Sequence, residues 1–207
     1  MKACTRPEAP DLIKRYGEEI GAEYASRKQA DRKYRFQWPL REGQNLGRLI
    51  HDTLKESMNE GHCAYCDGWP IDETSREEVD HFQPKGRPEF YRLVCNWNNL
   101  FLSCSACNNN KLEQWDEDLL RPDADDYDFM RYFEYETATG KLKPNPAASA
   151  DDRKRAEVTI RILGLCRDGA CTGRRNALRN YQAARRNPDD DRRIDDFPHR
   201  YLFSLLE

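Results

Sequence analysis

Four cysteines arranged as two CxxC pairs constrain this chain more than any other feature. Cys63 and Cys66 form the first pair, and Cys104 and Cys107 form the second. Each pair can present two thiolates from one tight turn, and two turns complete the tetrahedral four-sulfur sphere that zinc prefers. The alternative is that these cysteines are four small buried thiols without a metal. Two CxxC pairs in one chain make that interpretation the weaker one. Because four sulfurs leave no position for substrate, we predict one structural zinc ion per chain.

The rest of the composition bears on where the protein acts. The other four cysteines, Cys4, Cys95, Cys166 and Cys171, are interpreted as core residues or bystanders. Residues 1–4 lack the apolar stretch of a signal peptide, and no apolar run is long enough to span a bilayer. We therefore expect a cytoplasmic protein without a membrane segment, whose thiols are reduced or bound to metal.

Charge is distributed unevenly along the chain, although the net charge is only −3. The segment from Glu113 to Glu136 is strongly acidic, and the segment from Arg153 to Arg186 is strongly basic. Two interpretations stay open: solvated faces that neutralise each other, or separate surfaces for partners. In the second case the acidic segment contacts a protein, and the basic segment binds phosphates through Arg174, Arg175 and Arg179.

Hydrophobic periodicity and turn residues predict an α+β fold that is mostly helical. We expect helices at residues 8–30, 45–59, 105 to beyond 115, 151–165 and 173–186, strands at 76–82 and 99–103, and a hairpin at 129–142. These elements suggest one compact unit with three regions: a helical region at 1–60, a zinc-stabilised core at 61–116, and a hairpin with helices at 117–207. A charged tail begins near residue 187, and residues 197–206 are apolar enough to dock.

A second candidate metal site lies between and just after the cysteine pairs. Asp80 and His81 are neighbours on a predicted strand, so their side chains point to opposite faces. Asn108 directly follows the last cysteine, at the predicted start of a helix. A carboxylate and an amide oxygen can hold one hard divalent cation, while His81 takes a proton from an attacking water. Lys85 and Lys111 are candidate phosphate contacts. An Asp-His pair alone is weak evidence, since a lone histidine is more often structural.

This stretch resembles the HNH (ββα-metal) endonucleases in their form with two zinc knuckles. The family pattern is matched at Cys63, Cys66, Asp80, His81, Asn99, Leu100, Cys104, Cys107, Asn108 and Lys111. The resemblance implies a ββα-metal core in which Asp80 and Asn108 bind the catalytic metal and His81 is the general base. It also implies that Asn99 braces the loop that holds His81. Asn108 stands where the family often has histidine, and a neutral amide oxygen favours Mg²⁺ or Mn²⁺ over softer ions.

The wider chain is similar to the HNH nuclease subunits of Septu-type and retron-associated anti-phage defence systems. The similarity is carried by the segments CAYC, VDHFQPKG and WNNLFLSCSACNNNK, by the aromatic hairpin, and by residues 162–165. It implies an ABC-type ATPase subunit that restrains or licenses the nuclease. For retron-associated members it also implies a reverse transcriptase with its msDNA.

The predicted function is metal-dependent hydrolysis of nucleic-acid phosphodiesters, with DNA as the default substrate. RNA, including tRNA, is the alternative within the same type of system. A zinc-ribbon binding module without catalysis is a second class, whereas a zinc deaminase needs a zinc position open to water. Aromatic residues near the site, Phe82, Tyr91 and Trp97, can stack on bases, but we interpret them as core.

Overall fold

Small two-stranded ribbons set among helices make up this chain in the computed structural model, which describes residues 1–205, with only the backbone of Thr74. The helices are α1 (Asp11–Ala30), α2 (Leu46–Ser57), α3 (Ile71–Thr74), α4 (Ser105–Lys111), α5 (Phe129–Tyr132), α6 (Ala150–Ile162) and α7 (Asp168–Arg186). The strands are β1 (Leu40–Arg41), β2 (Gln44–Asn45), β3 (Glu77–His81), β4 (Leu100–Cys104), β5 (Phe133–Glu136) and β6 (Lys141–Pro144). Short 3₁₀ helices are η1 (Pro88–Leu93), η2 (Trp97–Asn99), η3 (Ile194–Asp196) and η4 (Arg200–Leu205). The predicted α+β class, mostly helical, is confirmed.

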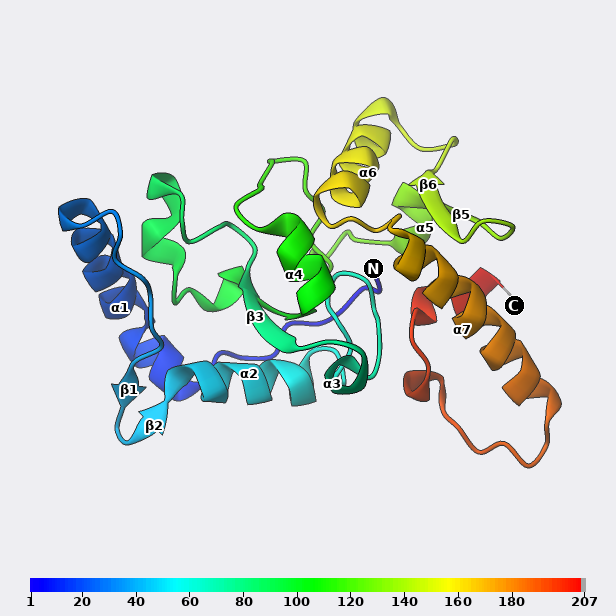
Figure 1. Cartoon of the computed structure of the whole chain (residues 1–207), viewed down its shortest axis with the longest axis horizontal. Helices are drawn as coiled ribbons and strands as arrows, with labels where there is room; N and C mark the ends of the chain where they lie inside the picture. The colour runs from blue at the N-terminus through cyan, green and yellow to red at the C-terminus, as the bar shows by residue number, and fades with distance from the viewer. Residues whose placement is uncertain (206–207) are drawn as a thin grey trace.

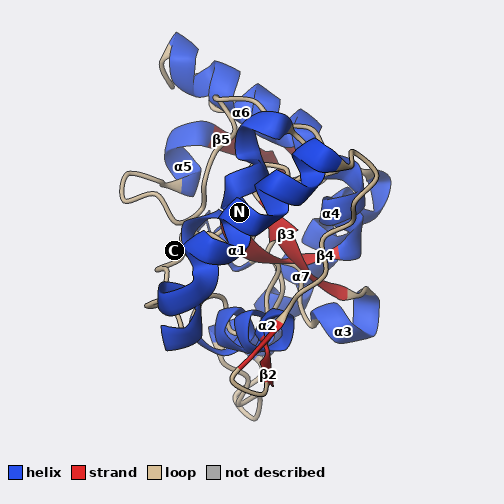
Figure 2. Ribbon diagram, turned by 90° about the vertical axis from the view of Figure 1, so that its left-hand side faces the viewer, coloured by secondary structure: helices blue, strands red, loops and turns tan. Residues whose placement is uncertain are grey.

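A β3–β4–α4 unit forms the centre of the molecule. β3 pairs with β4 in antiparallel register, which places Asp80 opposite Phe101 and His81 opposite Leu100. α4 begins directly after β4, so the chain folds back onto the same ribbon. Figure 1 shows β3 and α4 between α1 at one end and α7 at the other, and Figure 2 shows β3 and β4 enclosed by helices. Every residue of β4 is buried, in keeping with the apolar side chains of Leu100, Phe101 and Leu102 at its start.

The N-terminal helices hold the loop that follows β3. α1 packs on η1, and glycines at the contact allow a very close approach. A Cβ on Gly21 would lie 2.2 Å from the carbonyl oxygen of Arg92, so only glycine fits there. α2 starts at Asn45, whose side chain accepts a 3.0 Å hydrogen bond from the amide of Arg48, as an N-cap residue does. These contacts fix the backbone around Val94, which meets His81.

The C-terminal segment docks as its composition predicts. Within the described residues, Phe197, Leu202 and Phe203 are buried, and Phe203 stacks on Tyr181 of α7 with ring centroids 3.9 Å apart. Leu206 lies outside the described residues. α6 packs on the β5–β6 ribbon, and α7 packs on η4. None of the helices within residues 1–205 is long and apolar enough to cross a bilayer.

Two expectations about elements are wrong. The helix that begins at Ser105 ends at Lys111 rather than beyond residue 115, because Leu112 takes a positive φ of 46° and turns the chain away. Residues Phe129–Tyr132 form the short helix α5 rather than a strand. The carboxylate of Asp128 accepts from the amide of Met130 at 3.1 Å and caps this helix, and the ribbon starts only afterwards.

The acidic and basic segments partly neutralise each other. Lys154 pairs with Asp118 at 2.6 Å, across the two segments. Asp123 is buried and pairs with Arg6 at 2.7 Å, so its charge is also used inside the molecule. The basic patch expected at α7 is wrong in one respect, because the Arg174 side chain is buried. Its guanidinium donates to the carbonyl oxygens of Gly140 and Leu165, which makes it a structural cation.

Candidate active site

The four paired cysteines meet in one buried cluster. Their sulfur atoms all lie within 4.8 Å of one another, and all four residues are buried. The first turn docks on β4 through the amide of Ala64, which donates to the carbonyl oxygen of Leu102 at 2.9 Å. The amide of Cys104 donates to Sγ of Cys63 at 3.3 Å. This convergence brings the two halves of the predicted ligand set together.

The chemistry of this cluster fits a thiophilic cation. Burial is the main cause that raises the pKa of the Cys63 thiol well above its usual value, since a thiolate loses its hydration there. Within residues 1–205, one cationic side chain contacts a sulfur of this cluster: Arg167 contacts Sγ of Cys107 at 3.8 Å. Four thiolates in this volume need a divalent ion to balance their charge. Four buried cysteines at this spacing can therefore bind zinc.

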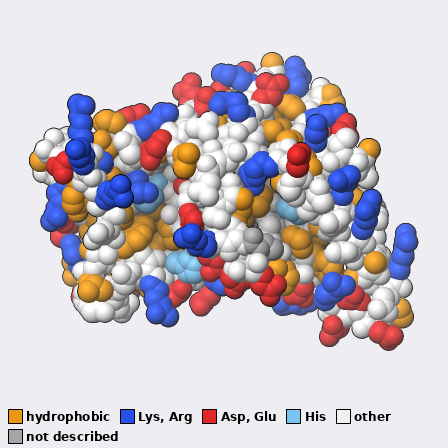
Figure 3. Space-filling model, in the orientation of Figure 1, with side chains coloured by type: hydrophobic (Ala, Val, Ile, Leu, Met, Phe, Trp, Pro, Cys, Tyr) orange, Lys and Arg blue, Asp and Glu red, His pale blue; other side chains and the backbone are white. Residues whose placement is uncertain are grey.

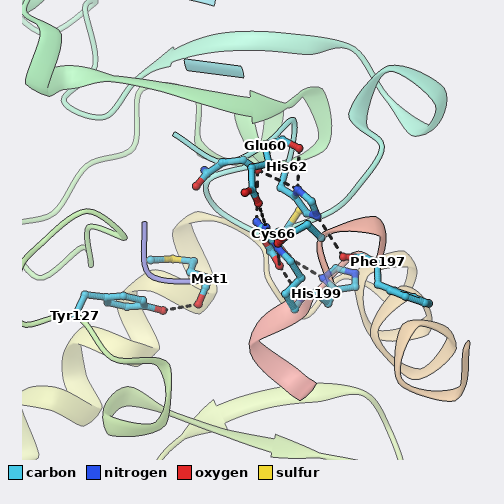
Figure 4. A network of polar contacts seen from close by, with 11 residues as sticks. Met1, Glu60, His62, Cys66, Tyr127, Phe197 and His199 are labelled. Carbon is cyan, nitrogen blue, oxygen red and sulfur yellow. Dashed lines mark hydrogen bonds and ion pairs between the residues drawn. The ribbon is translucent and has the colours of Figure 1, made fainter. Parts of the chain in front are cut away.

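A polar network ties the first knuckle to the C-terminal segment (Figure 4). The carboxylate of Asp67 accepts from the amide of Arg200 at 2.6 Å and from its guanidinium at 2.8 Å. His199 contacts the carbonyl oxygen of Cys66 at 2.8 Å, and His62 contacts that of Phe197 at 3.2 Å. Every ionised group named here has a partner, so this end of the site is structural.

Asp80 lies on the face of β3 that α4 covers. Its carboxylate accepts from the hydroxyl of Tyr65 at 2.6 Å and pairs with Nζ of Lys111 at 3.1 Å. Two residues earlier on the same face, Glu78 accepts a hydrogen bond from the side-chain amide of Asn108. The strand face with Glu78 and Asp80 therefore meets the helix face with Asn108 and Lys111.

This face offers the oxygen ligands that a hard cation takes. Burial raises the pKa of Asp80 above its ordinary value, although the charge of Lys111 opposes that shift. Half a turn of the Asn108 amide would direct its oxygen rather than its nitrogen at Glu78 and Asp80. Lys111 supplies one positive charge against the two carboxylates, and the Asn108 amide that donates to Glu78 carries none, so a cation can offset the remaining negative charge. Glu78 was not predicted; the signal is its two-residue spacing from Asp80 on a strand.

Lys111 does not fit the predicted phosphate contact. Its side chain is 0% exposed, and Nζ donates to the carbonyl oxygen of His81 at 2.6 Å besides pairing with Asp80. It therefore links β3 to the end of α4. Lys85 is half-buried, and its positive charge is near His81, since it contributes to the lowered pKa of that imidazole. That Lys85 contacts a phosphate stays a prediction.

His81 lies on the opposite face of β3 and has one unpaired nitrogen. Nε2 contacts the carbonyl oxygen of Val94 at 2.9 Å, and because a carbonyl only accepts, Nε2 carries the hydrogen. Nδ1 is buried and is one of the few side-chain atoms within residues 1–205 without a partner. Burial, helped by the charge of Lys85, lowers the pKa of His81 to about 3. The ring is therefore neutral at pH 7, with a free lone pair.

Asn99 is positioned to hold the loop beside His81. Its side-chain oxygen accepts from the amide of Gln83 at 2.7 Å, and its side-chain nitrogen donates to the carbonyl oxygens of Gln83 at 3.0 Å and Leu93 at 3.2 Å. One amide thus clamps both ends of the segment between β3 and Val94. Phe82 and Trp97 are buried and Tyr91 is half-buried, in keeping with core positions.

Comparison with known proteins agrees with this geometry. Residues 63–114 match the family described as HNH endonuclease, a family of phosphodiester hydrolases. A Septu protein PtuB from Bacillus mycoides (strain KBAB4) is 38% identical over 72 residues, which are 30% of this chain and 24% of that protein. A Septu protein PtuB from Bacillus thuringiensis is 41% identical over 54 residues, which are 26% of this chain and 20% of that protein. The matched part thus spans about a quarter or less of these relatives.

Proposed function

We propose that this chain, whose residues 63–114 are an HNH endonuclease domain, hydrolyses nucleic-acid phosphodiesters with the help of a divalent cation. The observation that carries the proposal is the unpaired Nδ1 of His81, the residue that follows Asp80 on β3. The opposite face of that strand offers carboxylate and amide oxygens. A buried polar atom without a partner is rare, and on a histidine of this motif it is what a general base that binds a water requires.

His81 is the general base of the proposed reaction. The carbonyl of Val94 holds the Nε2 hydrogen, so the lone pair on Nδ1 is free to accept the proton of an attacking water. As that proton moves to Nδ1, the water oxygen bonds to phosphorus and the bond from phosphorus to the leaving oxygen breaks. Asn99 acts indirectly, since it keeps the loop and the Val94 carbonyl in place.

Asp80 and Asn108 are the residues that would hold the catalytic metal, with Glu78 as a neighbour. Mg²⁺ or Mn²⁺ suits this set of oxygen ligands, and when bound it stabilises the charge that develops on the phosphate and the leaving oxygen. The four cysteines hold a separate structural zinc, one per chain, which closes the fold around β4 and α4. Its sphere is complete, so it takes no part in the reaction.

The biological setting that we infer is anti-phage defence. Both relatives are named Septu protein PtuB. By this relation an ABC-type ATPase subunit controls the nuclease, and a retron-associated version would add a reverse transcriptase with its msDNA. A gate of this kind suits a cytoplasmic nuclease, which would otherwise attack the DNA or RNA of its own cell.

The test is a cleavage assay with plasmid DNA, single-stranded DNA and total tRNA, each with and without the ATPase subunit. We expect cleavage with added Mg²⁺ or Mn²⁺ and none in EDTA. DNA cleavage is the favoured outcome, and cleavage of tRNA alone would establish the ribonuclease alternative. A folded, zinc-containing protein that binds nucleic acid but cuts none of the three under any condition is the result expected of a zinc-ribbon binding module.

A further inference from the structure

An aromatic path leads from the surface to the catalytic histidine. Trp38 stacks on His81 with ring centroids 5.9 Å apart and planes inclined by 12°. Phe36 meets Trp38 edge-on at 4.8 Å, and Tyr24 meets Phe36 at 5.4 Å and Tyr34 at 6.0 Å. Three of these rings belong to the loop between α1 and β1, which the general function of an HNH domain does not explain.

The same rings line a cavity of about 330 Å³. That volume lies at the lower end of the range of about 300–1,000 Å³ for pockets that bind small ligands. Tyr34, Phe36 and Trp38 are half-buried, so part of each ring remains accessible to a ligand. Arg27 and Arg41 complete the wall, together with Glu23, which pairs with Arg27. A flat apolar ligand with an anionic neighbour fits these surroundings.

Unpaired cations lie on the loop that supplies three of the cavity's aromatic rings. The loop reads Arg32-Lys33-Tyr34-Arg35-Phe36, so cations alternate with aromatic residues. Within residues 1–205, no ion pair engages the exposed Arg32, Lys33 or Arg35. Figure 3 shows Lys and Arg side chains, with hydrophobic side chains among them, at the end of the molecule that α1 and this loop form. Unpaired cations beside accessible rings are typical of grooves that bind single strands.

We propose that this cavity binds an unpaired nucleobase of the substrate strand, next to the phosphodiester that is attacked by the water which His81 deprotonates. The inference rests on the proposed function and adds the class of substrate: nucleic acid with at least one unstacked nucleotide at the cleavage site. A base in a duplex has both faces covered by its neighbours, so only an unpaired base can stack on Tyr34, Phe36 or Trp38. The flanking phosphates then lie within reach of Arg32, Lys33 and Arg35.

Trp38 packs tightly against one glycine, so its role in the cavity can be tested by substitution at that glycine. A Cβ on Gly47 would lie 2.5 Å from Cγ of Trp38, so the indole packs directly on the first turn of α2. Gly47→Ala therefore displaces Trp38 without removing any aromatic ring. Trp69 offers a matched control, since it is also half-buried and stacks on His62 with centroids 5.7 Å apart, outside the cavity.

The experiment measures binding in EDTA, so that it does not depend on cleavage. Labelled short single strands of DNA and of RNA, the same strands with one abasic position, and the matching duplexes are titrated with the full-length protein. We expect the parent to prefer the single strands. Trp38→Ala should lower that affinity roughly 5- to 150-fold, the range for loss of one stacked base. Trp38→Phe should retain most of the affinity, and Trp69→Ala should bind like the parent.

Tyr34→Ala and Gly47→Ala test the same proposal independently if Trp38→Ala fails to fold. Each variant should weaken the binding of single strands more than the binding of duplexes. The proposal is wrong if folded variants bind single strands like the parent, or if the parent binds duplex equally well. Metal-dependent cleavage that persists in these variants would then leave the proposed function intact. Conversely, stacking-dependent binding by a protein that never cuts would contradict the proposed function alone.

Discussion

Two buried histidines of this protein each stack on a tryptophan and differ in what their ring nitrogens face. His62 stacks on Trp69 with planes inclined by 20°, and His81 stacks on Trp38 with planes inclined by 12°. Both rings are buried, and burial lowers the pKa of both. The two residues lie at different places in the chain. His62 immediately precedes the first cysteine pair, whereas His81 is the last residue of β3.

The difference lies in how the ring nitrogens are satisfied. Nδ1 of His62 contacts the carbonyl oxygen of Asn59 at 2.9 Å, and its Nε2 contacts that of Phe197 at 3.2 Å. His81 satisfies only Nε2 and leaves Nδ1 without a partner. A neutral imidazole can donate from only one nitrogen, so only one of the two carbonyl groups accepts a hydrogen bond from His62, although both of its nitrogens are covered. Nδ1 of His81 instead keeps a lone pair that no group of the described residues engages. Under the proposed function, the open Nδ1 of His81, rather than burial or stacking, separates the catalytic histidine from the structural one.

The largest effect is expected at the structural end. Cys104→Ser removes one of the four sulfur ligands. The free energy of zinc binding, which stabilises the folded state, should be lost with it. We expect insoluble protein, or protein without a cooperative melting transition and with much less than one zinc per chain by elemental analysis. A soluble Cys104→Ser variant that melts cooperatively would contradict a structural role for the cluster.

The next largest effect is expected at the catalytic metal. Asn108→Ala removes an amide from the β3–α4 face, and Asn109→Ala removes an exposed amide one residue later as a matched control. Asn108→Ala should abolish Mn²⁺ binding and metal-dependent cleavage while zinc content and melting temperature stay near those of the parent. Mn²⁺ titration followed by electron paramagnetic resonance checks this. Equal Mn²⁺ affinity in both variants would remove Asn108 from the ligand set.

A smaller effect is expected at Asn99. Asn99→Ala breaks the bonds to Gln83 and Leu93, and the loop that presents the Val94 carbonyl to His81 should shift. Misplacement of a catalytic group by about 1 Å can cost up to about 10²-fold in rate, so we expect a loss of roughly 10- to 100-fold. Single-turnover cleavage rates measure it. A rate equal to that of the parent would mean that the loop holds His81 without this clamp.

Much of this account was predictable because its signals are local. The two CxxC pairs, Asp80, His81 and Asn108 lie within one stretch, and their strand or helix positions follow from short-range patterns. Burial of cations was not predictable. Arg174 and Lys111 look like surface charges in the sequence, and only long-range folding brings carbonyl oxygens and Asp80 to them.

The stacking of Trp38 on His81 was also not predictable from the sequence. The two residues are far apart in the chain, and they meet because Trp38 packs on α2. The alternation of cations and aromatic rings at 32–36 was the available signal for that loop.

The measurement that tests the central claim most directly compares His81→Ala with His62→Ala in the same cleavage and melting assays. The account predicts that His81→Ala keeps its fold and metal content but cleaves about 10²-fold or more slowly. His62→Ala should lose stability, by about 1–3 kcal/mol for buried carbonyl groups left unsatisfied, yet cleave near the parental rate below its melting temperature. If His81→Ala cleaves like the parent, or if His62→Ala loses activity while fully folded, the distinction between the two histidines is wrong.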